Sequence, residues 1–78
     1  SERARALALV FRLAREERDT WVNWPARAAA LMAAELSASC RDATGSQITV
    51  EPAAMQKVLE RHVRAHLDEL AEVRPDFR

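Results

Sequence analysis

Two histidines four residues apart, His62 and His66, are the first side chains in this sequence that could do chemistry. On a helix this spacing puts both imidazoles on one face, where they could bind zinc with Cys40 as a third ligand. The helical zinc-protease pattern needs a glutamate directly after the first histidine, and Val63 occupies that position. Because the ligands are so few, we expect no metal and no cofactor, and we expect both histidines to pack against another helix. A metal-binding regulator is the alternative.

Cys40 is also a candidate nucleophile, because one of the histidines could activate it. No glycine-rich turn or oxyanion element accompanies it, so the sequence predicts no enzyme activity. It is the single cysteine of the chain and forms no internal disulfide. A lone thiol suits a reducing compartment, which favours a cytoplasmic location.

Arginines concentrated in the first third of the chain could contact phosphates. They are Arg3, Arg5, Arg12, Arg15, Arg18 and Arg27. Acidic residues are interleaved with them, and the twelve basic and twelve acidic residues of the whole chain cancel. A nucleic-acid module carries a basic excess, so we expect a solvated face here. A small DNA-binding accessory protein that uses these arginines is the second alternative.

The composition predicts an all-α fold. The chain has sixteen alanines, one glycine and no tyrosine, which favours helix almost throughout. At 78 residues it is one domain, and a core of this size seldom contributes more than about 3–5 kcal/mol. No apolar run is long enough to span a bilayer. The sequence begins at Ser1, from which we expect a piece of a longer protein.

Apolar periodicity and turn residues predict three helices, over about 2–22, 25–38 and 51–73, with a loop over 39–50. Pro25 is expected to break or kink the chain, with Asn23 capping the helix that follows. The second and third helices are expected to form a hairpin, with the first across or beside it. Small side chains in the second helix, Ala29 and Ala33 among them, would let another helix approach closely.

Three long amphipathic helices with few large residues leave apolar stripes uncovered, so the sequence predicts a homo-oligomer. Both tryptophans lie next to Pro25, and tryptophan is enriched where partners bind. They could instead complete the hydrophobic core of one chain. If the core forms between chains, the tryptophans are core residues and binding residues at once. The residues expected at the interface are Trp21, Trp24, Met32, Leu36, Leu59, Val63, Leu67 and Leu70.

Four runs of residues carry a family resemblance that covers about residues 12–73. They are Arg18–Ala29 (RDTWVNWPARAA), Ala33–Leu36 (AAEL), Val50–Pro52 (VEP) and Leu59–Ala71 (LERHVRAHLDELA). In this order and spacing they resemble the C-terminal half of the small terminase subunits of tailed phages and prophages, the lambda-type DNA-packaging family.

The resemblance implies a non-catalytic part of a DNA-packaging protein that works in the cytoplasm of a bacterial host. Small terminase subunits read viral DNA with an N-terminal helix-turn-helix, assemble through a central helical region and recruit the large ATPase and nuclease subunit. This chain shows neither a helix-turn-helix nor a nucleotide-binding loop. The resemblance therefore implies self-association, possible binding of the large subunit, and DNA recognition through a region outside these residues.

Overall fold

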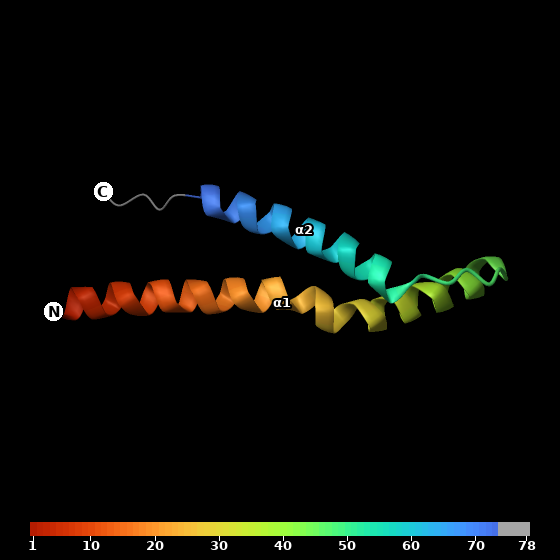
Figure 1. The fold of residues 1–78 in the computed structure, drawn as a ribbon, viewed down its shortest axis with the longest axis horizontal. Helices are drawn as coiled ribbons and strands as arrows, with labels where there is room; N and C mark the ends of the chain where they lie inside the picture. Colours follow the sequence, from red (N-terminus) through yellow and green to blue (C-terminus); the bar gives the residue numbers. More distant parts are fainter. Residues whose placement is uncertain (74–78) are drawn as a thin grey trace.

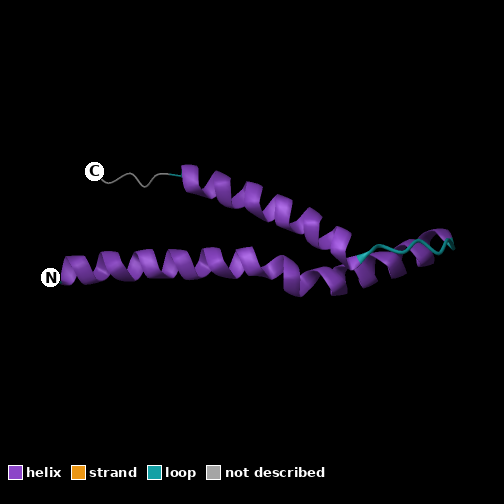
Figure 2. Ribbon diagram, viewed as in Figure 1, coloured by secondary structure: helices purple, strands orange, loops and turns teal. Residues whose placement is uncertain are grey.

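The computed structural model describes residues 1–73 and contains two helices (Figures 1 and 2). Helix α1 runs over Glu2–Thr44 and helix α2 over Pro52–Glu72, and residues 45–51 connect them. No strand occurs within residues 1–73, which confirms the all-α prediction. The predicted number of helices is wrong, because the first two expected helices form one continuous helix of 43 residues.

Helix α1 continues through Pro25, and Asn23 caps nothing. Its side-chain amide donates to the Asp19 carbonyl oxygen at 2.9 Å, one turn earlier in the same helix. A proline inside a helix removes one backbone hydrogen bond and costs about 3 kcal/mol. Two features offset this cost: strong helix formers follow Pro25, and the proline ring is itself buried. Figure 1 shows the result as a bend in α1 where the ribbon turns from orange to yellow.

The connection is shorter than predicted, because α1 includes residues 39–44. The helix ends at Gly45, whose φ of 72° lies in the left-handed region that glycine adopts without steric cost. The Gly45 N–H donates to the Arg41 carbonyl oxygen at 2.8 Å, which closes the last turn. Turn-forming residue types before this point are tolerated in the helix, and the left-handed glycine sets its end.

Helix α2 lies within one residue of its predicted bounds. Pro52 occupies its first turn, where the missing N–H has no intrahelical partner to lose. Glu51 precedes it in an extended conformation at the cap position, without a side-chain capping hydrogen bond.

The two helices pack antiparallel, as expected for a hairpin (Figure 1). Within residues 1–73 four side chains are buried: Pro25, Ala29, Ala33 and Leu67. Ala29 and Ala33 keep only 2% and 1% of their surface exposed, so small side chains do form the close-approach face of α1. We call this line of α1–α2 contact the seam.

Ser37 ties the connection to α1. Its hydroxyl donates to the Ala33 carbonyl oxygen at 2.8 Å and accepts from the Val50 N–H at 2.9 Å. The second bond joins residues thirteen positions apart and holds the start of α2 against the last turns of α1.

The molecule is long and thin, with extents of 63 × 22 × 17 Å and a radius of gyration of 18.6 Å. A compact domain of this length would have a radius of gyration of about 12 Å. The accessible surface is 6878 Å², whereas a compact monomer of this mass exposes about 4,800 Å². One copy therefore exposes about 2,000 Å² more than a compact fold would. Neither helix within residues 1–73 has a stretch long and apolar enough to cross a bilayer.

Candidate interaction surface

A first groove lies between α1 and α2 on one side of the seam and has a volume of about 360 Å³. Its apolar part comes from both helices: Val22 and Pro25 on α1, Val63 and Leu67 on α2. Two arginines and two acids complete its walls. They are Arg18, Arg64, Glu60 and Asp68. The groove thus has an apolar floor with charges of both signs around it, which suits a helix with an apolar stripe and a polar border.

A second groove of the same volume is formed nearer the C-terminal end of α2. Ala14, Glu17, Arg18 and Trp21 contribute from α1, and Leu67, Leu70 and Ala71 from α2. Trp21 also meets Trp24 edge to face, with ring centroids 5.8 Å apart and planes at 79°. Leu67 and Arg18 line both grooves, so the two grooves adjoin one another.

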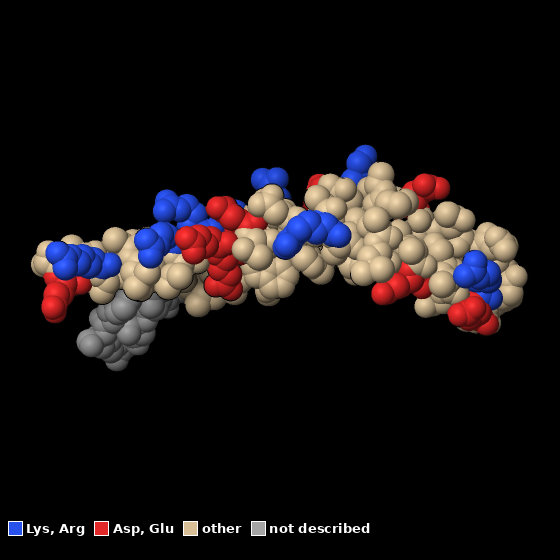
Figure 3. Space-filling model, turned by 90° about the horizontal axis from the view of Figure 1, so that it is seen from below, with Lys and Arg blue, Asp and Glu red and all other residues tan. Residues whose placement is uncertain are grey.

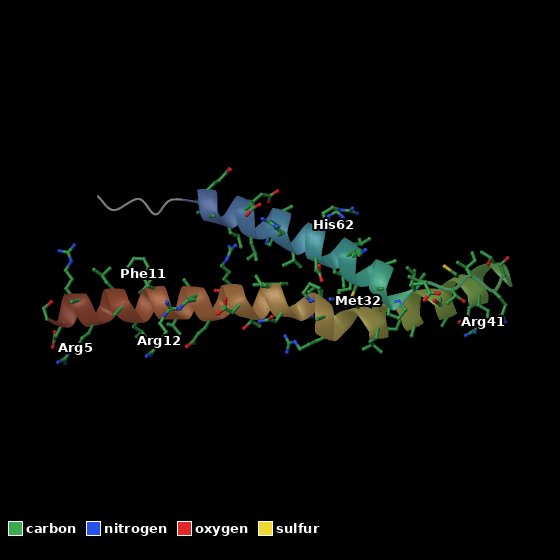
Figure 4. The ribbon with its side chains drawn as sticks, in the orientation of Figure 1. Arg5, Phe11, Arg12, Met32, Arg41 and His62 are labelled. Atoms are coloured by element: carbon green, nitrogen blue, oxygen red, sulfur yellow. The ribbon has the colours of Figure 1, made fainter. Side chains whose placement is uncertain are left out.

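Helix α1 extends past the end of α2, as Figure 1 shows. Ala14 is its first residue in either groove, so we define residues 2–13 as the projecting segment. Its five large apolar side chains are all 45–70% exposed, and three of them lie on one face: Leu7, Val10 and Phe11. With Ala14 they follow steps of three and four and form one stripe. Figure 4 shows Phe11 on the side of α1 that faces α2, and Arg5 and Arg12 on the opposite side.

The interface prediction missed this stripe. Its apolar spacing is visible in the sequence, but the first helix was expected to lie across or beside the hairpin of the other two. Whether a helix end has a partner within its own chain depends on how far the opposing helix reaches. Here α2 has 21 residues against 43 in α1, which leaves the start of α1 without an opposing helix in the described chain.

The eight predicted interface residues divide into two groups. Five are covered within a single chain: Leu67 is buried, while Trp24, Met32, Leu59 and Val63 are half-buried. Three keep a larger exposed fraction: Trp21 at 39%, Leu36 at 44% and Leu70 at 47%. Trp21, Leu67 and Leu70 lie together in the second groove, and Val63 and Leu67 in the first.

The expected packing of the histidines is wrong, because both are exposed. Figure 4 shows His62 on the side of α2 that faces away from α1. His66 Nδ1 lies 4.0 Å from Glu69 Oε2, with the imidazole side chain 60% exposed. Cys40 is half-buried near the other end of α1. Residues 1–73 contain no group of three His, Cys, Asp or Glu side chains placed to hold a metal ion.

The arginines of α1 lie on solvated surface, as expected. The six from Arg3 to Arg27 are all exposed, and so is Arg41 in the last turn of the helix. In Figure 3 basic and acidic side chains are interspersed along the face of the molecule that is shown.

The stripe of the projecting segment meets the second groove at the open end of the hairpin, where α2 ends, and the first groove shares Arg18 and Leu67 with the second. Together they form one apolar surface that combines a concave part and a protruding part. Comparison of the chain with protein-family models, with curated proteins and with solved structures finds no match. Its function is therefore inferred from its own residues and surfaces.

Proposed function

We propose that this chain is a non-catalytic self-association module, whose hydrophobic core is completed by another copy. The observation that carries the proposal is the exposed apolar stripe of α1 beside two apolar grooves. A chain of this size needs a core of its own, a metal, disulfides or another chain to be stable. Four buried residues in residues 1–73 make a small core, and the single cysteine forms no internal disulfide.

The surface area supports the same proposal. A stable protein–protein interface buries about 800 Å² on each partner. The chain exposes about 2,000 Å² more than a compact monomer of its mass, about two and a half times that requirement. Burial of the apolar part of this surface is worth about 25 cal/mol per Å² before the entropic cost of association is subtracted.

Light scattering at two protein concentrations tests self-association. We expect a mass of at least twice 8.8 kDa at the higher concentration, with dissociation on dilution if binding is weak. A mass of one chain at several hundred micromolar would contradict the proposal. The exposed stripe would then have to bind a protein of a different kind.

The resemblance to small terminase subunits supports a more specific proposal: the module assembles a phage or prophage DNA-packaging protein. In that role the large terminase subunit is a possible second partner, and DNA is bound through a region outside these 78 residues. The balanced net charge supports this division of labour, because DNA-binding modules carry a basic excess.

Fluorescence anisotropy with duplex DNA separates this role from that of a DNA-binding accessory protein. We expect the 78-residue chain alone to show no binding tighter than the micromolar range at physiological salt, because acids are interleaved with its arginines. A variant with Arg3, Arg5 and Arg12 changed to alanine is the control and should behave as the wild type does. Tight binding that weakens steeply with salt, and that this variant loses, would favour the accessory-protein alternative.

A further inference from the structure

We infer that two copies associate antiparallel, with the projecting segment of each lying in the grooves of the other. The inference rests on the proposed self-association and specifies its partner, its surface and its direction. The occupant of the grooves is a second copy of this chain, through residues 2–13 of α1. The two copies are then related by a twofold axis, and the same surface is used on both.

The stripe of the projecting segment continues the seam. Leu7, Phe11 and Ala14 follow the same steps of three and four that lead on to Arg18 and Trp21 in the grooves. Phe11 lies on the side of α1 that faces α2 (Figure 4). The face that packs on α2 inside one copy thus extends, uncovered by α2, beyond the end of that helix. A helix laid against this face extends an interface that already exists.

The projecting segment and the grooves have nearly the same length in one chain. Residues 2–13 span about 18 Å of helix. The grooves border α1 from Ala14 to Pro25, a stretch of nearly the same length. When the copies are antiparallel, each projecting segment lies beside one such stretch, so both stripes and both sets of grooves are covered at once.

Charge distribution favours the antiparallel direction. Residues 2–15 hold four arginines and one glutamate, which makes this end of α1 basic. Residues 65–73 at the end of α2 hold Asp68, Glu69 and Glu72 and no lysine or arginine. In the antiparallel arrangement Arg12 and Arg15 of one copy lie near the acidic end of α2 in the other, because residue 13 of one copy lies opposite Ala14 of the other. A parallel arrangement would place two basic ends side by side, which is unfavourable.

Cross-linking of single-cysteine chains tests the arrangement. Ala4→Cys, placed on the stripe side of the projecting segment, is mixed with Arg64→Cys, placed on the wall of the first groove. Both carry Cys40→Ser and are joined with a short bismaleimide reagent. Within one copy Arg64 lies beside Val22 and Pro25, about 27 Å or more along α1 from Ala4. A link between the two positions can therefore form only between copies, and we expect this mixed product to predominate.

Three outcomes would count against the inference or the proposal beneath it. Products that link Ala4→Cys chains to one another, without the mixed product, would indicate a parallel pair. A dimeric mass with neither product would show that the projecting segment lies outside the interface. Both results would overturn the inference and leave self-association intact. A monomeric mass for the wild type would instead overturn self-association itself.

Two leucines of the projecting segment provide a matched pair of variants. Leu7 and Leu9 are 46% and 45% exposed, and two residues along a helix separate them by about 200° around its axis. We expect Leu7→Asp to raise the dissociation constant of the dimer by about a hundredfold or more, because it places a charge in the buried stripe. Leu9→Asp should change it by about threefold or less. Equal effects of the two substitutions would overturn the inference.

Discussion

Replacing Leu67 with alanine is expected to lower the free energy of unfolding by about 2–5 kcal/mol. Leu67 is only 6% exposed and is the one large aliphatic side chain buried within residues 1–73. It also lines both grooves, so its removal would join them through a void in the seam. The expected loss is comparable with the whole stability of a hairpin of this size.

Urea unfolding followed by circular dichroism, at a protein concentration where the chain is monomeric, measures this loss, since association would otherwise change the apparent stability. Leu70→Ala is the matched control, because the same side chain three residues later is 47% exposed. We expect the control to cost about 1 kcal/mol or less. Similar losses for the two variants would mean that Leu67 does not form the centre of the seam.

Helix content and the α2 hairpin arm were predictable from the sequence, because each depends on local signals. Alanine-rich composition favours helix, and Glu51 and Pro52 mark the start of α2. The path of the chain at Pro25 was not predictable in this way. Proline inside a helix has a local cost, but here the ring is buried, and burial depends on the opposing helix. A local rule therefore predicts a break or a kink without deciding between them, and tertiary packing maintains one bent helix.

The candidate surface was predicted in part. Spacing along α2 identified Val63, Leu67 and Leu70, because a stripe that persists over several turns leaves little choice of face. Phe11 was not assigned to the interface, although the same spacing rule applies to it. Periodicity indicates which face of a helix is apolar, but it does not tell which part of that face the chain itself covers. The relative lengths of α1 and α2 decide this.

The histidines show again that periodicity does not tell which side chains of a helix face are covered. His62 and His66 were assigned to the apolar face of α2 because they fit its steps of three and four. Both are exposed in the structure, since α1 is a single helix and covers only a narrow part of the α2 surface. A helix that contacts one neighbour buries roughly two positions of each seven, and side chains at the border of this stripe remain in solvent.

Replacing Ala29 with leucine is expected to destabilise the hairpin by about 1–3 kcal/mol through overpacking. Ala29 is 2% exposed at the close approach of α1 and α2, so a larger side chain has no space unless the helices separate. Ala30→Leu is the matched control, because the adjacent alanine is exposed. The two substitutions have nearly the same effect on helix propensity, so a difference in urea midpoint reports on the seam alone.

The same pair of variants links folding to assembly. Because the seam holds α2 at the position that forms both grooves, Ala29→Leu should also weaken self-association, whereas Ala30→Leu should leave it unchanged. Leu7→Asp should weaken self-association but leave the stability of the hairpin unchanged. At concentrations where the chain is monomeric, this variant should unfold at the wild-type urea concentration, because Leu7 lies outside the grooves. If Ala29→Leu kept the wild-type stability, α1 and α2 would be less closely packed than their buried alanines indicate. If it lost stability but associated as the wild type does, the interface between copies would lie away from the seam.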